Sequence, residues 1–254
     1  MKTHSIIIAI LFFSISITGQ NKGLEVAKKA DAADLGFESS SVSLTMVLTN
    51  RNGQKSTRQM KTKTLELSED GDKSLITFES PRDVKGTATL TFTHKVGADD
   101  QWLFLPSISR VKRISSNNKS GPFMGSEFAY EDLSSQEVEK YTYKFVEDKD
   151  GLIIVEQDPV DPKSGYTRRL VSYNKEKGYR IEKVEFYDRK NSLLKTLIYK
   201  DYKTYLDKHW RANIMTMTNH QTNKKTELTF SDYKFKLGLT DEDFSQNALK
   251  RAGK

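Results

Sequence analysis

The stretch SVSLTMVLTNRNGQKSTRQMKTKTLEL, residues 41–67, decides the fold class. Apolar side chains occupy every second position of its first part, at Val42, Leu44, Met46 and Leu48. A period of two predicts a β-strand with one buried face and one solvated face. The dipeptide Asn52-Gly53 follows, which is a strong signal for a tight hairpin turn. Residues 56–67 are then expected to return as the partner strand.

The same alternation continues through most of the chain. Further strand-like segments lie at residues 74–80, 86–95, 101–106, 109–115, 139–147, 151–158, 166–174, 179–188, 192–202, 209–219 and 226–235. Turn-rich sequences such as DKDG (148–151) separate them. Many short strands at regular spacing predict a mainly β protein, a single antiparallel sandwich or barrel. Helical patterns are confined to residues 23–37 and to a short turn within 237–251.

The first 20 residues have the pattern of a secretory signal peptide. Lys2 provides the basic start, an apolar run extends over residues 6–13, and small residues near Gly19 mark the expected cleavage point. The apolar run is short for a membrane span. Residues 21–254 then form one domain, because no change in composition marks a second one.

Cysteine is absent from the chain, which excludes disulfides, Cys metal sites, a thiol nucleophile and a lipid anchor on cysteine. An exported chain without disulfides is expected in a bacterial periplasm.

No motif of a known enzyme class is present, and neither an enzyme nor a cofactor is predicted. The histidines His4, His94, His209 and His220 lie far apart and show no metal-binding spacing. Nucleophile-elbow, P-loop and dinucleotide fingerprints are missing as well. The sequence does not exclude a glycosidase with paired carboxylates, because the two acids of such an enzyme need only meet in space.

A formal net charge of +7 at pH 7 can attract nucleic acid or acidic partners. The basic residues are nevertheless interleaved with acidic ones along the whole chain. In residues 141–145, the aromatic side chains Tyr141, Tyr143 and Phe145 fall on the face opposite to Lys144. This arrangement favours a half-buried strand over a nucleic-acid platform, on which bases and cations share one face. We therefore expect no nucleic-acid partner.

Residues 85–134 resemble the outer membrane lipoprotein-sorting protein family, whose members are exported bacterial proteins with the LolA-like fold. The recurrent blocks of that family stand here as DDQWLFLP (99–106), RVKRI (110–114) and FMGSEFAYEDL (123–133). Residues 178–203 and 228–245 resemble the late hairpin and the closing strand of LolA-like proteins. The resemblance covers most of residues 40–245.

The resemblance implies a curved, incompletely closed antiparallel β-barrel of the LolA/LolB type, with about 11 strands. Short helices would cover an apolar cavity that holds the acyl chains of a lipid or lipoprotein for transfer towards the outer membrane. An inner-membrane exporter of the resistance-nodulation-division type and an outer-membrane acceptor are the implied partners of a monomeric protein. The alternative is a non-enzymatic accessory or scaffold protein of such an exporter, with a filled core.

The segment GPFMGSEFAYEDL, residues 121–133, fits neither a regular strand nor an amphipathic helix. We interpret it as an insertion at the barrel mouth, either a fixed plug or a moving lip. Its acids are expected to pair with Arg110, Lys112 or Arg113 across the opening. The apolar residues expected at the cavity or lid are Trp102, Phe104, Phe123, Met124, Phe128, Tyr130, Tyr141, Tyr143 and Phe145. The charged residues expected at the rim are Arg110, Arg113, Glu127, Glu131 and Asp132.

Overall fold

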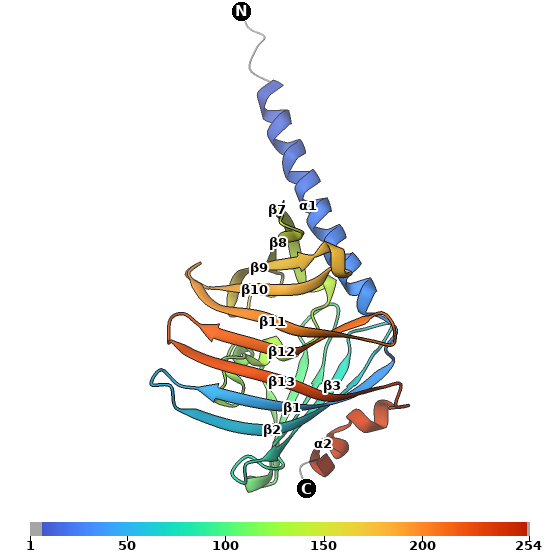
Figure 1. Ribbon diagram of the computed structural model, residues 1–254, viewed down its shortest axis with the longest axis vertical. Helices are drawn as coiled ribbons and strands as arrows, with labels where there is room; N and C mark the ends of the chain where they lie inside the picture. Colours follow the sequence, from blue (N-terminus) through green and yellow to red (C-terminus); the bar gives the residue numbers. More distant parts are fainter. Residues whose placement is uncertain (1–6, 253–254) are drawn as a thin grey trace, which may run out of the picture.

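One antiparallel sheet of 13 strands dominates the computed structural model, which describes residues 7–252 without the side chains of residues 7–18 and 20 (Figure 1). The strands are β1 (Ser39–Thr49), β2 (Lys55–Leu65), β3 (Lys73–Ser80), β4 (Ala88–Phe92), β5 (Asp100–Leu105), β6 (Arg110–Ile114), β7 (Tyr141–Lys149), β8 (Leu152–Pro159), β9 (Tyr166–Asn174), β10 (Arg180–Asp188), β11 (Leu193–Tyr205), β12 (His209–Asn219) and β13 (Lys224–Phe235). The helices are α1 (Ile7–Asp34) and α2 (Gln246–Ala252). Short 3₁₀ helices lie at Pro106–Ile108, Ser116–Asn118, Phe123–Gly125, Tyr130–Leu133, Val138–Lys140, Lys175–Lys177 and Asp241–Phe244.

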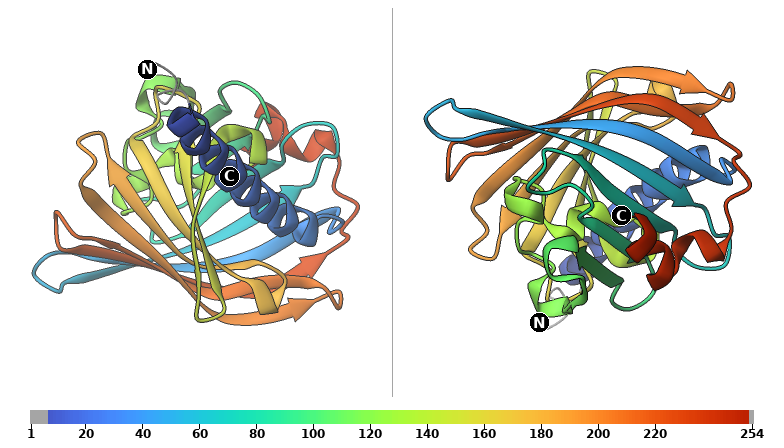
Figure 2. Two further views of the ribbon diagram at one scale, coloured as in Figure 1. Left: turned by 90° about the horizontal axis from the view of Figure 1, so that it is seen from above. Right: turned by 90° about the horizontal axis from the view of Figure 1, so that it is seen from below.

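The strand order is β6-β5-β4-β3-β2-β1-β13-β12-β11-β10-β9-β8-β7, so β6 and β7 are free edges and the barrel stays open. Figure 2 shows the sheet curling around an inner face that α1 crosses. The expected incompletely closed antiparallel barrel is therefore confirmed. The sheet has 13 strands where the resemblance implies about 11, because each of the alternating segments forms a strand of its own.

Alternation within the strands divides the apolar side chains between two clusters on opposite faces of the sheet. On β3, Ile76 and Phe78 belong to the large cluster on the concave face. Leu75, which directly precedes Ile76 in the strand, belongs to a smaller cluster on the convex face. The smaller cluster is covered by Phe244 and by Leu249 of α2. The molecule thus has a main core inside the curve of the sheet and a satellite core outside it.

The pattern at residues 23–37 predicts a helix, and the structure has one there, α1, which ends at Asp34 and packs against the edge strand β7. Gly23 makes the close approach possible, because an added Cβ would lie only 3.0 Å from the backbone of Lys144 and Phe145. Val26 and Ala27 are buried in the main core one turn later. Within residues 7–252, no helix combines the length and the apolar character that a bilayer crossing requires. The expected signal peptide begins outside the described residues, so it stays a prediction.

Candidate functional site

Residues 121–133, here called the plug segment, fill part of the concave face. Phe123 has no exposed surface and packs against Phe78 and Tyr130, with ring centroids 5.7 and 5.5 Å apart. Pro122 and Ala129 form a β-bridge that closes the segment on itself. The turn between them requires positive φ angles, 49° at Met124 and 77° at Gly125, and glycine adopts such angles without steric cost.

The plug segment is tied to the middle of the sheet by a buried ion pair. The side chains of Asp132 and Lys195 are only 6% and 4% exposed, and their Oδ2 and Nζ atoms lie 2.6 Å apart. Asp132 also accepts hydrogen bonds from the Tyr166 hydroxyl at 2.9 Å and from the backbone amide of Ala129 at 2.6 Å. Lys195 donates a further hydrogen bond to the Glu127 carbonyl at 3.0 Å.

The other acids of the segment also have their partners outside β6. Glu127 accepts a hydrogen bond from the Asn219 side chain at 2.7 Å. Glu131 accepts from the Ser164 hydroxyl at 2.8 Å and from the backbone amide of Gly165 at 2.9 Å, and burial raises the pKa of its carboxyl group.

The predicted pairing of these acids with Arg110, Lys112 or Arg113 is therefore wrong. Arg113 instead pairs with Asp100 on the neighbouring strand, and Arg110 and Lys112 are exposed on β6. The prediction failed because it placed the charges on one rim by proximity in sequence, whereas β6 is an edge strand whose cations point to solvent.

The remaining expected site residues divide between the two faces. Tyr141, Tyr143 and Phe145 point from β7 towards the main core, as predicted, and the Tyr143 hydroxyl donates to the Val138 carbonyl at 2.7 Å. Trp102 and Phe104 instead belong to the convex-face cluster below α2. They do not share a surface with Phe123, Met124, Phe128 and Tyr130, which all pack in or against the main core. Alternation shows that one face of a strand is apolar, but it does not show which way that face points.

A row of polar side chains that the sequence analysis missed crosses the concave face. Strand register aligns Gln157, Arg169, Lys195 and Asn219 from β8 to β12, with the apolar Phe186 of β10 between Arg169 and Lys195. A signal for it exists in the pair Arg168-Arg169: in a strand, consecutive side chains point to opposite faces, so one arginine must point inward. Arg168 faces Glu156 and Asn191, while Arg169 points inward.

Arg169 is 8% exposed, yet no described carboxylate lies within ion-pair distance of it. Its Nε donates to the Gln157 side-chain oxygen at 2.7 Å, and its Nη1 donates to the side-chain oxygen of Gln136. The guanidinium lies over the ring of Tyr141, 3.8 Å from the centroid. All the acceptors around this cation are neutral.

Two further tyrosines line the same part of the concave face. The Tyr173 hydroxyl accepts a hydrogen bond from the Gln157 amide at 2.7 Å, and burial raises the pKa of Tyr173 to about 12. Burial also raises the pKa of Tyr199, although its side chain is only half-buried. At neutral pH both phenols keep their protons and remain hydrogen-bond donors.

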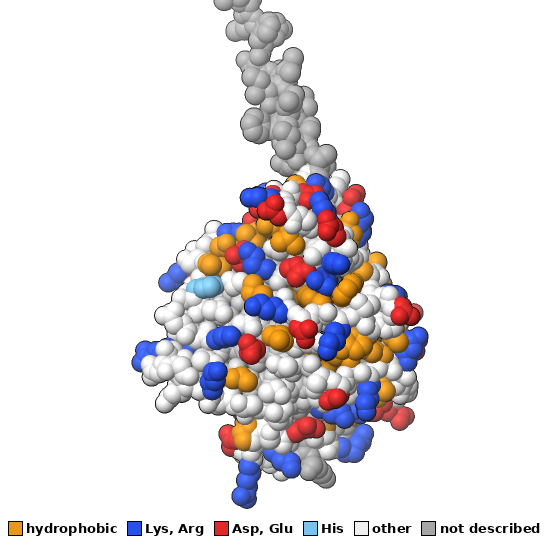
Figure 3. All heavy atoms as spheres, viewed as in Figure 1, with side chains coloured by type: hydrophobic (Ala, Val, Ile, Leu, Met, Phe, Trp, Pro, Cys, Tyr) orange, Lys and Arg blue, Asp and Glu red, His pale blue; other side chains and the backbone are white. Residues whose placement is uncertain are grey.

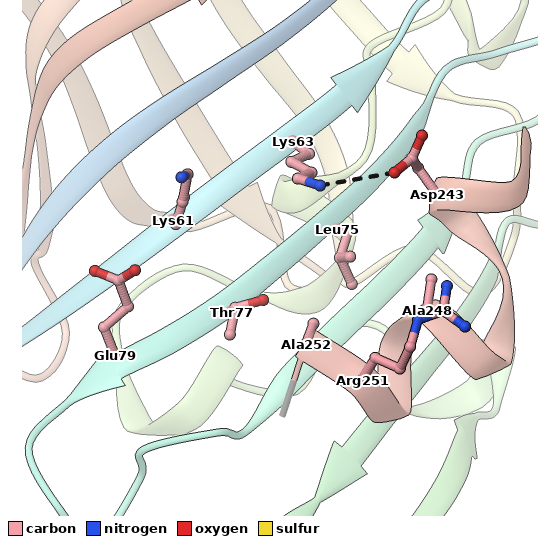
Figure 4. Close-up of a pocket in the computed structure, with 9 residues that line it drawn as sticks. All are labelled: Lys61, Lys63, Leu75, Thr77, Glu79, Asp243, Ala248, Arg251 and Ala252. Carbon is pink, nitrogen blue, oxygen red and sulfur yellow. Dashed lines mark ion pairs between the residues drawn. The ribbon is translucent and has the colours of Figure 1, made fainter. Parts of the chain in front are cut away.

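A separate hollow of about 390 Å³ lies on the convex face between the sheet and α2 (Figure 4). Leu75, Ala248 and Ala252 supply its apolar lining. Lys61, Lys63, Glu79, Asp243 and Arg251 surround it with charges of both signs, and Lys63 lies 3.7 Å from Asp243. Among the described residues, no group of three or more His, Asp or Glu side chains stands where it would hold a metal ion.

Comparison with known proteins identifies the family. A family model described as "Uncharacterized protein" matches residues 70–251, and no curated protein matches the chain. The structure is similar to that of an outer membrane lipoprotein-sorting protein domain from Vibrio parahaemolyticus, with 55% identity, a TM-score of 0.89, and coverage of 91% of this chain and 100% of that one.

Two more distant structures share the fold. A DUF1329 family protein from Desulfovibrio piger is 28% identical, with a TM-score of 0.84 and coverage of 91% of this chain and 99% of that one. A LolA superfamily protein from Nitrosomonas europaea is 22% identical, with a TM-score of 0.71 and coverage of 89% and 98%. The chain therefore belongs to the outer membrane lipoprotein-sorting protein family and has its LolA-like fold.

Proposed function

We propose that the protein is a periplasmic carrier that binds the acyl chains of a lipid or lipoprotein on the concave face of its sheet and delivers them towards the outer membrane. Membership of the lipoprotein-sorting family supports this proposal. The observation that carries it is the state of the concave face, where apolar side chains of the late strands stay only partly buried. Tyr199, Met215 and Phe230 pack against the main core without being enclosed by it.

Acyl chains match this surface physically. Each methylene group that leaves water contributes about 0.8 kcal/mol, so binding needs dry apolar contact and no reacting group. Helix α1 and the plug segment lie over the same face and would shelter a chain from solvent (Figure 2). Two acids of the plug segment are occupied: Asp132 by Lys195, and Glu131 by Ser164 and Gly165. These contacts favour a binding role over hydrolysis by a carboxylate pair.

The surface chemistry is consistent with a protein that diffuses between partners. Figure 3 shows Lys and Arg side chains intermixed with Asp and Glu over the outer face of the strands. A mixed surface maintains solubility without a large field of one sign. In this proposal, the protein is exported by the signal peptide of residues 1–20, and an inner-membrane exporter and an outer-membrane acceptor are its donor and recipient.

One observation favours the alternative, an accessory protein of an exporter with a filled interior. Phe123 is completely buried. Glu131 anchors the plug segment to the loop between β8 and β9, Asp132 anchors it to β11, and Glu127 anchors it to β12. A plug held in this way packs against Phe78 of β3 and occupies part of the concave face that a ligand would otherwise use.

Native mass spectrometry of the protein purified from its own periplasm distinguishes the two functions. The intact mass reports the cleavage site, expected near Gly19. A stoichiometric adduct, extracted and identified as a lipid or acylated protein, is the expected result. A clean apo mass that stays unchanged after incubation with lipids and acylated peptides would refute the carrier and support the accessory protein.

A further inference from the structure

The two cations in the polar row of the concave face, Lys195 and Arg169, differ in whether a carboxylate neutralises them. Lys195 has a carboxylate partner in Asp132, and a third donor, the Tyr166 hydroxyl, completes that cluster. Arg169, two strands away in the same row, contacts amide oxygens and an aromatic ring. An ionised group away from water is ordinarily paired with an opposite charge, because neutral dipoles replace its hydration only in part. Among the side chains that the structure describes, the row therefore contains one neutralised cation, Lys195, and one without a counter-charge, Arg169.

The surroundings of Arg169 supply donors in excess of acceptors. Gln157 uses its oxygen to accept from Arg169 and its amide to donate to the Tyr173 hydroxyl, which leaves the phenolic proton of Tyr173 directed elsewhere. The half-buried Tyr199 stands on β11, on the same concave face. A group of guanidinium and phenol donors with few acceptors is suited to an anion, whose oxygens accept several hydrogen bonds at once.

Two side chains cover the guanidinium of Arg169: the ring of Tyr141 lies over it, and Gln136 contacts its Nη1 atom. Gln136 is exposed, and its side-chain oxygen accepts from both Arg169 and the Tyr141 hydroxyl, the latter at 2.8 Å. Gln136 belongs to the connection between the plug segment and β7, outside any strand. The Gln136 amide donates to the Ser134 carbonyl at 2.7 Å. Rotation of the Gln136 side chain would break these local hydrogen bonds and uncover Nη1 of Arg169 without movement of the sheet.

We propose that Arg169 anchors the anionic head group, a carboxylate or a phosphate, of the amphiphile whose chains lie on the concave face. An oxygen of the head group takes the place of the Gln136 amide oxygen at the guanidinium. This inference rests on the proposed carrier function and adds to it the class of cargo, an anionic amphiphile. Arginine is the residue suited to this task, because its planar fork matches carboxylate and phosphate oxygens bidentately.

The test compares ligands that share a chain and differ in charge. Residues 21–254 are loaded with the neutral probe N-phenyl-1-naphthylamine, which is then displaced by oleate, monoolein or oleoyl-lysophosphatidylglycerol below their micelle-forming concentrations. Loss of a hydrogen bond to a charged group corresponds to about a 10- to 100-fold change in affinity. We therefore expect at least one anionic ligand to displace the probe at a concentration about tenfold or more below that of monoolein. Preference for oleate identifies a carboxylate, and preference for the lysophospholipid identifies a phosphate.

Variants connect the preference to Arg169. Arg169→Met should remove it, whereas Arg168→Met should keep it, because Arg168 faces Glu156 and Asn191 on the other side of the strand. Should Arg169→Met fail to fold, the exposed residue Gln136 gives a second test. Gln136→Glu places a carboxylate against the guanidinium, so it should abolish the anion preference and raise the melting temperature. Gln136→Ala, which only removes the amide, should preserve the preference.

Each outcome separates the two proposals. Equal displacement by oleate, the lysophospholipid and monoolein in the wild-type protein overturns the role of Arg169 and leaves the carrier function standing. A preference for anionic ligands that survives in both Arg169→Met and Gln136→Glu also overturns the role of Arg169. Displacement by none of the ligands, or failure of the probe to bind, refutes the carrier function itself.

Discussion

The buried pair between Lys195 and Asp132 is predicted to be the main electrostatic anchor of the plug segment. Lys195→Met keeps the length and apolar stem of the side chain and removes its charge. Asp132 then keeps only the Tyr166 hydroxyl and the Ala129 amide as donors, in a place where its side chain is 6% exposed. Removal of one partner of a buried ion pair costs about 3–5 kcal/mol, because the remaining charge is left uncompensated.

For a domain of this size, each kcal/mol lowers the melting temperature by about 2–4 °C, so a decrease of about 6–20 °C is expected. The matched control is Lys225→Met, which breaks a surface pair with Glu227 whose side chains are 45% and 38% exposed. Such a pair contributes about 1 kcal/mol or less. Urea unfolding of residues 21–254, followed by tryptophan fluorescence and circular dichroism, gives the free energy of unfolding for each variant.

The double variant Lys195→Met with Asp132→Leu should recover part of the lost stability, because no charge then remains unpaired. Recovery stays partial, since the donors of Tyr166 and Ala129 lose their acceptor. A Lys195→Met variant that unfolds at the same urea concentration as Lys225→Met would refute the reasoning, and the plug segment would then be held by apolar packing alone.

Three further predictions concern packing, pH and the docking of α1. Phe123→Ala removes a completely buried ring and should lower the free energy of unfolding by about 3–5 kcal/mol in urea titrations; lost stability with unchanged lipid retention supports a fixed plug, and unchanged stability contradicts it. Burial raises the pKa of Asp72 to about 7, so this carboxyl group binds its proton more tightly in the folded state. Its contribution to stability is complete below about pH 4 and is lost as the pH rises through about 7. Asp72→Asn should therefore flatten the decrease in stability over that range, and an unchanged profile would count against the buried carboxyl group. Gly23→Leu should displace α1 from β7 and increase hydrogen exchange in residues 21–34, whereas Glu25→Leu, at an exposed position, should not; equal exchange in the two variants would show that the contact is dispensable.

Local patterns in the sequence were sufficient to predict most strands and the fold class. The alternation of Val42, Leu44 and Met46 and the turn at Asn52-Gly53 predict the β1–β2 hairpin, which the structure contains. The blocks within residues 99–133 predict the family, and the open antiparallel barrel follows from it. These properties depend on neighbouring residues, for which a period of two or a turn dipeptide has direct physical meaning.

The tertiary structure alone decided which face of each strand is inside and which charges meet. The segment of Trp102 and Phe104 is apolar on both sides in the sequence, and the structure places these two side chains on the convex face, whereas Tyr141 and Tyr143 face the main core. Asp132 and Lys195 form an ion pair although 63 positions separate them in the sequence. Arg169 lies in the same row as Lys195 because of the register of five strands, β8 to β12. Register and curvature are set by all strand pairings together, because a shift of one residue in any strand would turn its side chains to the other face. The alternation in the sequence therefore determined where the strands of this protein lie. The residues that meet at its candidate site were determined only when all strand pairings were in place.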